Sequence, residues 1–574
     1  MEGRIGLFYW QGRFGLTGRV IKRVSQIFPD GGGILLRGRV KKNKRKNKQK
    51  KPRSGKAIRL ATKWKKGFFS ILFSRFGFIL ILLLIQIWVM MSIWTMLKEL
   101  VSDYLLLIQS VFEVLVILAL INRPMNSSAK LSWTLLISAM PLSGTLFYVW
   151  TTVEMGYGTI RQKLMQINLE SAGYIHQSEA AARKIKAINR ESAALSHYLT
   201  RYDLTAVYDN VNVRYFPVGE DKFECMLDEL EKATDFIFLE YFIIEEGYMW
   251  GRVLEILTRK AKEGVDVRVM YDGTCEFSKL PHDYPRRLQE VGIQCKVWER
   301  IKPVITSSYN YRDHRKILII DGKAAFCGGI NLADEYINKV NKFGHWKDTA
   351  IMLEGAAVDS FTVMFLQMWN VWEKDREDFN HYLGKYDRRI RCDGCVIPYA
   401  ESPMNNHKIA ERVYTDILYS AKDYVYIMTP YLILDDELTA ALRFAAERGV
   451  DVRIILPGIP DKKLIWLLGR NQYLHLLEAG VKIYEYTSGF VHSKVFLSDN
   501  IKAVVGTINL DYRSLYHHFE CAAYLVGVSC LKDIQTDFTG LFASSREITA
   551  EILHRQNFVY RIAGAAMRVI APLL

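Results

Sequence analysis

The chain has 574 residues, 50% of them hydrophobic, so it is long enough to bury more than one core. Its formal net charge of +16 is confined to the N-terminal end, because residues 1–76 hold 22 Lys and Arg against two acidic residues, while the rest holds 55 basic and 59 acidic residues. The remaining chain therefore lacks the positive field of a nucleic-acid-binding domain, and we expect no nucleic acid as a partner.

Residues 1–75 predict a basic, disordered tail. The stretch KKNKRKNKQKKPR (41–53) has no apolar residue apart from its proline, so it cannot form a core. We interpret the tail as a solvated arm beside a membrane segment. The alternative is a specific contact with anionic lipids or RNA.

The next segment, 76–150, holds three apolar runs of the length that crosses a bilayer. The run FGFILILLLIQIWVMMSIWT (76–95) is uncharged, a second run lies at 104–121, and a third lies at 131–150. Pro141 falls inside the third run, and spanning helices tolerate proline. The sequence thus predicts two to three N-terminal transmembrane helices and a multi-pass protein of the cell membrane; buried core helices are the alternative.

The charges around these runs predict their orientation. The basic residues before the first run place the N-terminus in the cytoplasm, and Arg123 and Lys130 place the connection between the second and third runs there too. Three crossings would put everything after residue 150 outside the cytoplasm. A run that enters the membrane and turns back would reverse that side, and Glu113 makes the second run the candidate.

Behind a predicted helical connector at 151–200, an α/β pattern occurs twice. In each copy a buried strand, a helix ended by glycine and a second strand follow one another. The copies predict two related domains of the α/β class, 201–390 and 391–574. The matching segments are strands 235–244 and 265–273 with helix 251–264, and strands 423–434 and 450–458 with helix 436–449.

Each copy leads into the same polar motif. The first motif holds His314, Lys316, Asp321 and Asn331, with Lys two residues after His, Asp five after Lys and Asn ten after Asp. Residues two apart on a strand face the same side, so the His and Lys of each copy face one cleft. The second motif repeats the spacing with His492, Lys494, Asp499 and Asn509.

An imidazole beside an ammonium suits a phosphodiester as substrate. The lysines and asparagines of both motifs would neutralise the non-bridging oxygens as charge builds in the transition state. One histidine would attack phosphorus while the other protonates the leaving alcohol. Two motifs that meet at an interface therefore make one complete site, and neither half is sufficient alone.

The doubled pattern HxKx4Dx6Gx2N resembles the phospholipase D superfamily. More narrowly, NYRDHRKILIIDGKAAFCGGINLADEYINK, FGHWKDT and GTINLDYRS are similar to bacterial cardiolipin synthases. This resemblance implies two pseudo-symmetric phospholipase D-like α/β/α domains packed together. One departure is Gly329, where the family usually has Ser or Thr; Thr507 keeps the hydroxyl in the second copy.

The resemblance also implies a role for each motif residue. His314 would be the nucleophile, and His492 the acid and then the base. Asp321 and Asp499 would be mainly structural and anchor the backbone around the site. The phosphate would be held by Lys316, Lys494, Asn331 and Asn509.

Two acids outside the motifs are similar to the acids that orient the imidazoles in the family. They are Asp348 in HWKDT and Glu520 in HHFEC, each expected to act from the opposite half. A carboxylate on the remote ring nitrogen fixes the tautomer and supports charge on the histidine. We interpret His517 and His518, which also follow the second motif, as cleft-edge or solvent residues.

The reaction that the resemblance implies is transphosphatidylation without cofactor or metal. A phosphatidyl group would pass between two phosphatidylglycerol molecules, through a phosphatidyl-histidine, to give cardiolipin and glycerol. Phosphatidylglycerol, other anionic phospholipids and the bilayer would be the partners. The alternatives are a phospholipase D-type hydrolase or another phosphatidyltransferase, and, from a different class, a membrane scaffold with an inactive site.

A single CxxC, Cys392 and Cys395, is weak support for zinc or redox chemistry.

Overall fold

The computed structural model describes residues 58–60, 88, 91–92, 95–96 and 103–571, apart from 153–156, 204, 301–309, 406 and 556–557. Nearly all of the basic tail and most of the apolar run at 76–95 lie outside these residues. The described residues belong to one unit, Gly55–Leu574.

The first half builds a mixed sheet of seven strands, in the order β1-β8-β6-β5-β2-β3-β4. The strands β2, β3 and β4 are parallel, and the other pairs are antiparallel. The bounds are β1 Val211–Phe216, β2 Phe236–Tyr241, β3 Asp266–Asp272, β4 Gln294–Trp298, β5 Lys316–Ile320, β6 Ala324–Gly328 and β8 Ala350–Gly355.

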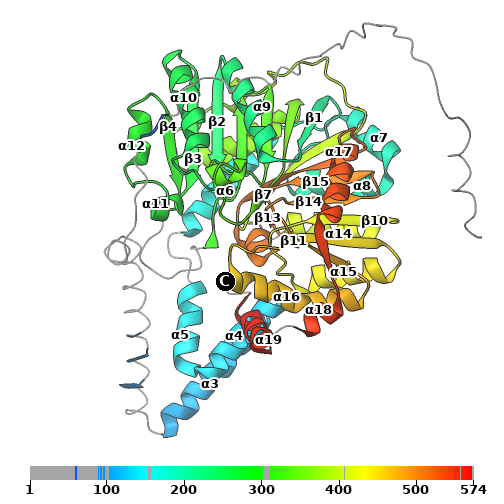
Figure 1. The fold of residues 1–574 in the computed structure, drawn as a ribbon. Coiled ribbons are helices and arrows are strands. Elements are labelled where there is room, and N and C mark those ends of the chain that lie inside the picture. The colour runs from blue at the N-terminus through cyan, green and yellow to red at the C-terminus, as the bar shows by residue number, and fades with distance from the viewer. Residues whose placement is uncertain are drawn as a thin grey trace, which may run out of the picture. The chain divides into compact units, whose positions relative to one another are not determined.

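The second half repeats this order as β9-β16-β15-β14-β10-β11-β12 and adds β17 at the β12 edge. In Figure 1 the first half is coloured mainly green and the second half yellow to red. Its β10, β11 and β12 are again parallel. The shared order confirms the α/β class and shows that the repeat extends through the whole sheet. The bounds are β9 Cys395–Glu401, β10 Tyr424–Met428, β11 Asp451–Pro457, β12 Lys482–Tyr486, β14 Val495–Ser498, β15 Lys502–Gly506, β16 Glu520–Val526 and β17 Ser545–Ile548.

Each sheet has a core on both faces, because its central strands are apolar at nearly every position. In β2 (FIFLEY) all six residues are buried; Ile237 and Leu239 pack with α9 and α10, while Phe236 and Phe238 face the other way. In the second half α14 and α15 pack on the equivalent outer face. The helices of both halves are α9 Gly219–Lys232, α10 Tyr248–Lys262, α11 Cys275–Ser278, α12 Tyr284–Gln289, α13 Val358–Trp369, α14 Ile409–Ser420, α15 Asp436–Glu447, α16 Lys463–Glu478, α17 Leu531–Ala543, α18 Ala550–His554 and α19 Phe558–Ile570.

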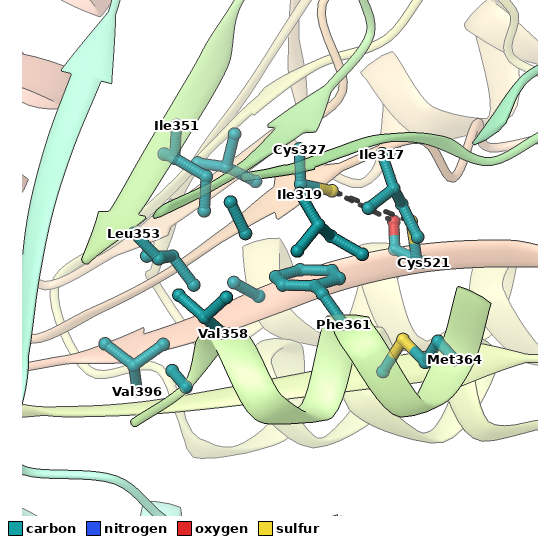
Figure 2. Packing of buried hydrophobic residues seen from close by; sticks show 14 of the residues in the cluster. Ile317, Ile319, Cys327, Ile351, Leu353, Val358, Phe361, Met364, Val396 and Cys521 are labelled. Carbon is teal, nitrogen blue, oxygen red and sulfur yellow. Dashed lines mark hydrogen bonds between the residues drawn. The ribbon is translucent and has the colours of Figure 1, made fainter. Parts of the chain in front are cut away.

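The inner faces of the two sheets share one core with α13 and α17. Figure 2 shows Phe361 of α13 among aliphatic side chains of the first sheet, with Val396 of β9 nearby. Cys327 of β6 and Cys521 of β16 also meet across the halves, with their sulfur atoms 3.6 Å apart as free thiols. The halves are therefore joined by a continuous apolar interior.

One of the predicted spanning runs is divided into two shorter helices. The run at 131–150 does not form one helix: α4 (Ser127–Ala139) ends before Met140, and α5 (Pro141–Thr152) begins at the proline. A proline lacks the amide hydrogen that a continuing helix needs, so a helix begins well at this residue. The run at 104–121 forms α3 (Asp103–Ile121). Among the residues described, no helix combines the length and the apolar character of a membrane span.

The connector between these helices and the first sheet is helical, as predicted. It comprises α6 (Tyr157–Ser171), α7 (Glu179–Ile188) and α8 (Arg190–Tyr202). Ser178 and Asn189 cap α7 and α8, because their side chains accept hydrogen bonds from the first turn. Residues of α6 pack in the core shared by both sheets, and residues of α7 and α8 pack in the core of the second half.

Candidate active site

The two His-Lys pairs stand at the starts of equivalent strands. Lys316 is the first residue of β5, and Lys494 directly precedes β14. All four side chains are buried, with His314 6% and His492 7% exposed. Both pairs are therefore held by the central strands of their sheets rather than by surface loops.

Each motif is tied to the opposite half through its backbone. The His314 amide donates to the carbonyl of Phe519 at 2.9 Å, and the His492 amide donates to the carbonyl of Lys347 at 2.7 Å. The short strands β7 (His345–Lys347) and β13 (Gly489–Val491) pair in parallel directly before the second contact. This exchange brings the two motifs into one site.

The two acids predicted to orient the imidazoles are both in place. Nδ1 of His314 lies 2.8 and 2.9 Å from the two carboxylate oxygens of Glu520. Nδ1 of His492 lies 2.7 Å from Oδ2 of Asp348. An ionised carboxylate only accepts hydrogen bonds, so Nδ1 of His314 carries the hydrogen and its Nε2 keeps a lone pair for chemistry. Nδ1 of His492 also lies 2.9 Å from Nζ of Lys494, so it carries the hydrogen when Asp348 is ionised.

The lysines pack directly against the histidine backbone. Lys316 Nζ donates to the carbonyl of His314 at 2.5 Å, and Lys494 Nζ donates to the carbonyl of His492. Burial lowers the pKa of Lys316 to about 8 and that of Lys494 to about 7. An anionic phosphodiester between them would favour the charged form of both lysines.

Burial and the neighbouring lysines hold both histidine pKa values well below their ordinary range. For His314 burial is the largest cause, followed by the charges of Lys316, Lys494 and His492. For His492 burial is again first, followed by Lys494 and Lys316. Both imidazoles are therefore neutral in the free protein, which is the form that a nucleophile and a base require.

Gly329, the departure from the family pattern, makes room for Asp348. A Cβ atom at residue 329 would lie 2.0 Å from Oδ1 of Asp348. In the second half Thr507 keeps its hydroxyl, and that hydroxyl donates to Glu520 at 2.5 Å. In the second half, the Thr507 hydroxyl therefore supports the orienting acid Glu520. In the first half there is no hydroxyl at residue 329, and the shorter acid Asp348 packs directly against the Gly329 backbone.

The two motif aspartates hold turns rather than facing the imidazoles. Asp321, at a φ of 52°, accepts hydrogen bonds from the amides of residues 234–236. Asp499, at a φ of 53°, accepts from the amides of residues 422–424. Each fixes the end of the strand that carries the His-Lys pair to the start of its neighbour.

The two motif asparagines differ in how many of their side-chain atoms already have a hydrogen-bond partner in the protein. Oδ1 of Asn331 accepts from the amide of Ile243 at 3.0 Å, and its Nδ2 donates to the Tyr336 hydroxyl at 2.7 Å. The Tyr336 ring in turn packs edge-on against His492. Oδ1 of Asn509 is buried with no hydrogen-bond partner among the described residues. That both hold phosphate stays a prediction.

His518 is closer to the chemistry than its sequence suggests. It is buried, its ring lies 5.3 Å from that of His314, and its Nδ1 lies 3.6 Å from Glu520. Burial lowers the pKa of His518 to about 3, so its imidazole is neutral. Of the two interpretations of His518, cleft-edge or solvent, its burial excludes the solvent one. His517 is enclosed enough for burial to lower its pKa to about 4.

The position of His518 in the sequence, relative to Glu520, could have indicated that His518 lies in the site. It stands two residues before Glu520, as Trp346 stands two residues before Asp348, and Trp346 packs 5.6 Å from the His492 ring. The same offset in the two halves places a ring beside each reacting imidazole.

Within the described part of the chain, ligand atoms of His314, His518 and Glu520 lie close enough to hold a metal ion. A reaction without metal or cofactor stays a prediction.

The structure has two features of a phospholipase D-type fold. One is the pair of related sheets, and the other is the two His-Lys pairs, in which each histidine bonds to a carboxylate of the opposite half. A solved structure with a similar fold is the phosphatidylserine synthase of Haemophilus influenzae, with a TM-score of 0.51 and 12% identity, covering 67% of this chain and 100% of that one. A family model described as "Cardiolipin synthase, PLD-like domain" matches residues 226–369 and 414–542, one segment in each half.

The chain belongs to the cardiolipin synthase family of the phospholipase D superfamily. It is 32% identical to the cardiolipin synthase of Alkalihalophilus pseudofirmus over 81% of this chain and 92% of that protein. It is also 32% identical to cardiolipin synthase 2 of Bacillus anthracis, over 81% and 90%. An uncharacterized protein of Streptococcus mutans is 52% identical over 80% of this chain and 99% of its own length.

Proposed function

We propose that the protein is a cardiolipin synthase that transfers a phosphatidyl group from one phosphatidylglycerol to another. The observation that carries this proposal is the pair of buried, neutral imidazoles, each oriented by a carboxylate from the opposite half. Family membership supports the substrate class. The finer assignments below are part of the proposal.

In the first step Nε2 of His314 attacks phosphorus and the bond from phosphorus to the glycerol oxygen breaks. His492, protonated as the anionic phosphodiester raises its pKa, gives its proton to the leaving glycerol. Lys316 and Lys494 neutralise the non-bridging oxygens. The result is a phosphatidyl-histidine, free glycerol and a neutral His492.

In the second step the terminal hydroxyl of another phosphatidylglycerol loses its proton to His492 and attacks the same phosphorus. The bond from phosphorus to nitrogen breaks, which releases cardiolipin and restores neutral His314 and protonated His492. Water in place of the second lipid would make the protein a hydrolase, and a different alcohol would make it another phosphatidyltransferase.

A product assay separates these alternatives. Purified protein would be given phosphatidylglycerol with an isotope label in the glycerol head group, and the products would be identified by mass. Cardiolipin together with free labelled glycerol in equal amounts is the expected result. Phosphatidic acid as the sole lipid product would instead identify a hydrolase.

The proposal includes a place in the cell membrane, with several crossings and a cytoplasmic N-terminus. Apolar side chains exposed on α3 support a lipid-facing segment; they include Leu107, Val111, Leu115 and Leu118. Three crossings predict that a reporter fused after Arg201 reports from outside the cytoplasm. A cytoplasmic signal at that point would mean that one of the three apolar runs does not cross.

A further inference from the structure

Three buried side chains beside the proposed nucleophile converge on one point. Nδ1 of His314 lies 2.8 Å from Oε1 of Glu520, and Nδ1 of His518 lies 3.6 Å from the same oxygen. The ligand atoms of the three side chains all lie within 4.8 Å of one another. Two ring nitrogens therefore face one carboxylate oxygen.

The mechanism above uses only two of these side chains. His314 and Glu520 bond to each other, and each has a role in the transfer. Nδ1 of His518, by contrast, is buried and has no hydrogen-bond partner among the described residues, although the side chain is only 7% exposed. A buried polar atom without a partner is uncommon in a native protein and indicates a site for a bound ion or water.

The donor set selects the kind of ion. Two imidazole nitrogens and one glutamate oxygen are the protein ligands of zinc centres that keep a fourth position open. With bonds of about 2.1 Å, a tetrahedral zinc ion holds its ligand atoms roughly 3.4 Å apart, and the separations of 2.8 and 3.6 Å lie on either side of that value. Mg²⁺ and Ca²⁺ prefer sets of oxygen ligands, so this set does not suit them.

The surroundings of the carboxylate also suit a metal ligand. The Thr507 hydroxyl donates to Oε2 of Glu520 at 2.5 Å, which fixes the carboxylate and leaves Oε1 for the ion. Hydrogen bonds of this kind orient the ligands of known metal centres. The rings of His314 and His518 are 6% and 7% exposed, so the group is not sealed from solvent.

An ion at this point would remove the nucleophile. The neutral His314 ring carries one hydrogen, which in the free protein lies on Nδ1 and leaves the lone pair of Nε2 for phosphorus. A metal bond to Nδ1 uses the lone pair of that nitrogen, so the single hydrogen moves to Nε2 through solvent and the ring neither gains nor loses a proton. Nε2 then has no lone pair with which to attack.

We propose that His314, His518 and Glu520 form a zinc-binding site whose occupation switches off the first step of the transfer. The ion binds Nδ1 of both rings and Oε1 of the carboxylate, and water takes the fourth position. His518 contributes a ligand to the ion and takes no part in the transfer itself. The activity that is switched off rests on the proposed function, whereas the zinc site does not depend on it.

Zinc binding tests the site directly. Full-length protein in detergent, freed of metal with a chelator, would be titrated with zinc chloride by calorimetry, and with Co²⁺, whose visible absorption reports tetrahedral coordination. His518→Phe keeps a ring and removes both ring nitrogens, so its Kd for zinc should rise at least about tenfold. His518→Leu, a smaller apolar side chain, should give the same result. His517→Phe is the matched control, because it makes the same change at the neighbouring histidine, outside the group, and should keep the wild-type affinity.

Inhibition tests the switch. The zinc concentration that halves the activity should be the same for wild type and His517→Phe, and at least about tenfold higher for His518→Phe. Each protein is compared with itself without zinc, so a change in its basal activity does not affect the result. Excess chelator should restore the wild-type activity. In His492→Ala, zinc should prevent a nitrophenyl phosphodiester from loading His314, and this measurement needs no change at His518.

The outcomes separate the site, the switch and the proposed function. Equal zinc affinity in wild type and His518→Phe, or an equal loss of affinity in His517→Phe, would overturn the site. Zinc that binds through His518 and leaves the loading of His314 unchanged would overturn the switch. Phosphatidic acid as the sole product without zinc would refute cardiolipin synthesis, whereas zinc binding that depends on His518 would still support the site.

Discussion

At the scale of single residues, the two histidines are not equivalent. His314 bonds to Glu520, which also accepts from Thr507 and lies beside a second imidazole, His518. His492 bonds to Asp348 and packs against aromatic rings. Since neighbours set the proton affinity of a histidine, different surroundings favour different roles for the two.

Replacing each histidine separately tests this division of labour. His314→Ala should form no phosphatidyl-enzyme, because the atom that bonds to phosphorus is absent. His492→Ala should still form one from a nitrophenyl phosphodiester, whose leaving group needs little protonation, and should retain it for lack of a base. Intact-protein mass spectrometry after acid-free quenching, with proteolysis, should map one phosphatidyl group to the peptide containing His314.

The reverse pattern would reassign the roles. An adduct on His492 that accumulates in His314→Ala would make His492 the nucleophile. Absence of an adduct from both variants, while wild-type protein forms product, would support direct displacement and refute the covalent mechanism.

Gly329 gives a second test at this scale. Gly329→Ser restores the residue type usual in the family, but its Cβ would collide with the Asp348 carboxylate at 2.0 Å. The displaced acid would no longer orient His492, so we expect kcat to fall at least about tenfold. Thr507→Ser keeps the hydroxyl that supports Glu520 and should remain close to wild type. Full activity in Gly329→Ser would show that Asp348 does not need its present position.

The sequence predicts the residues of the site better than their surroundings. Both His-Lys pairs follow from spacing, because strand alternation and the internal repeat are local or periodic signals. Both orienting acids follow from the resemblance to the family. The placement of His518 beside His314 depends on which loops meet in space. Spacing alone does not give that information.

At the scale of elements, the strongest predictions are the central strands and their crossover helices. The expected strands at 235–244 and 265–273 appear as β2 and β3, and the expected helix at 251–264 appears as α10, beginning three residues earlier. The sequence does not predict the parallel pairing of β7 with β13, which come from opposite halves. Strands of three residues carry almost no periodic signal, and their pairing joins segments about 140 residues apart.

We expect the pairing of β7 with β13 to be essential for catalysis. A Cβ at Gly489 would lie 2.1 Å from the carbonyl oxygen of His345, so Gly489→Ala should force β13 away from β7. Asp348 and His492 follow these two strands directly, and their contact should open. We expect a loss of activity of at least about tenfold together with a lower Tm.

Gly540→Ala is the control for that variant. Gly540 lies inside α17, where an added Cβ would meet open space, and alanine favours a helix by up to about 1 kcal/mol over glycine. The activity of this variant should be unchanged and its Tm equal or higher. If Gly489→Ala lowered Tm but kept full activity, the exchange would be structural only.

At the scale of the whole molecule, the two halves form one folding unit. Their inner sheet faces, α13 and α17 share a single core, and Cys327 and Cys521 touch across it. Separating the halves would expose apolar surface on both, at a cost that grows with the area exposed. The active site inherits this property, because each histidine takes its orienting acid from the other half.

The described end of the N-terminal tail contacts the first half through Ile58 and Leu60. The Ile58 amide donates to the Gly251 carbonyl at 3.1 Å, and the Leu60 amide donates to Glu246 at 3.2 Å. Arg287 also donates to the Leu60 carbonyl at 2.7 Å. No residue of the proposed site lies in the tail, so its removal should matter through these contacts.

Two truncations separate the charge of the tail from its contacts. Deletion of residues 2–54 removes most of the basic residues and keeps 58–60, so specific activity in detergent should stay close to wild type. Deletion of residues 2–60 also removes three hydrogen bonds and leaves the buried Glu246 carboxylate with fewer donors. That protein should keep its activity per folded molecule but lose about 1 to 3 kcal/mol of unfolding free energy, measured by denaturant titration. A tenfold loss of activity in the shorter deletion, about 1.4 kcal/mol of barrier, would show that the basic tail acts in the reaction itself.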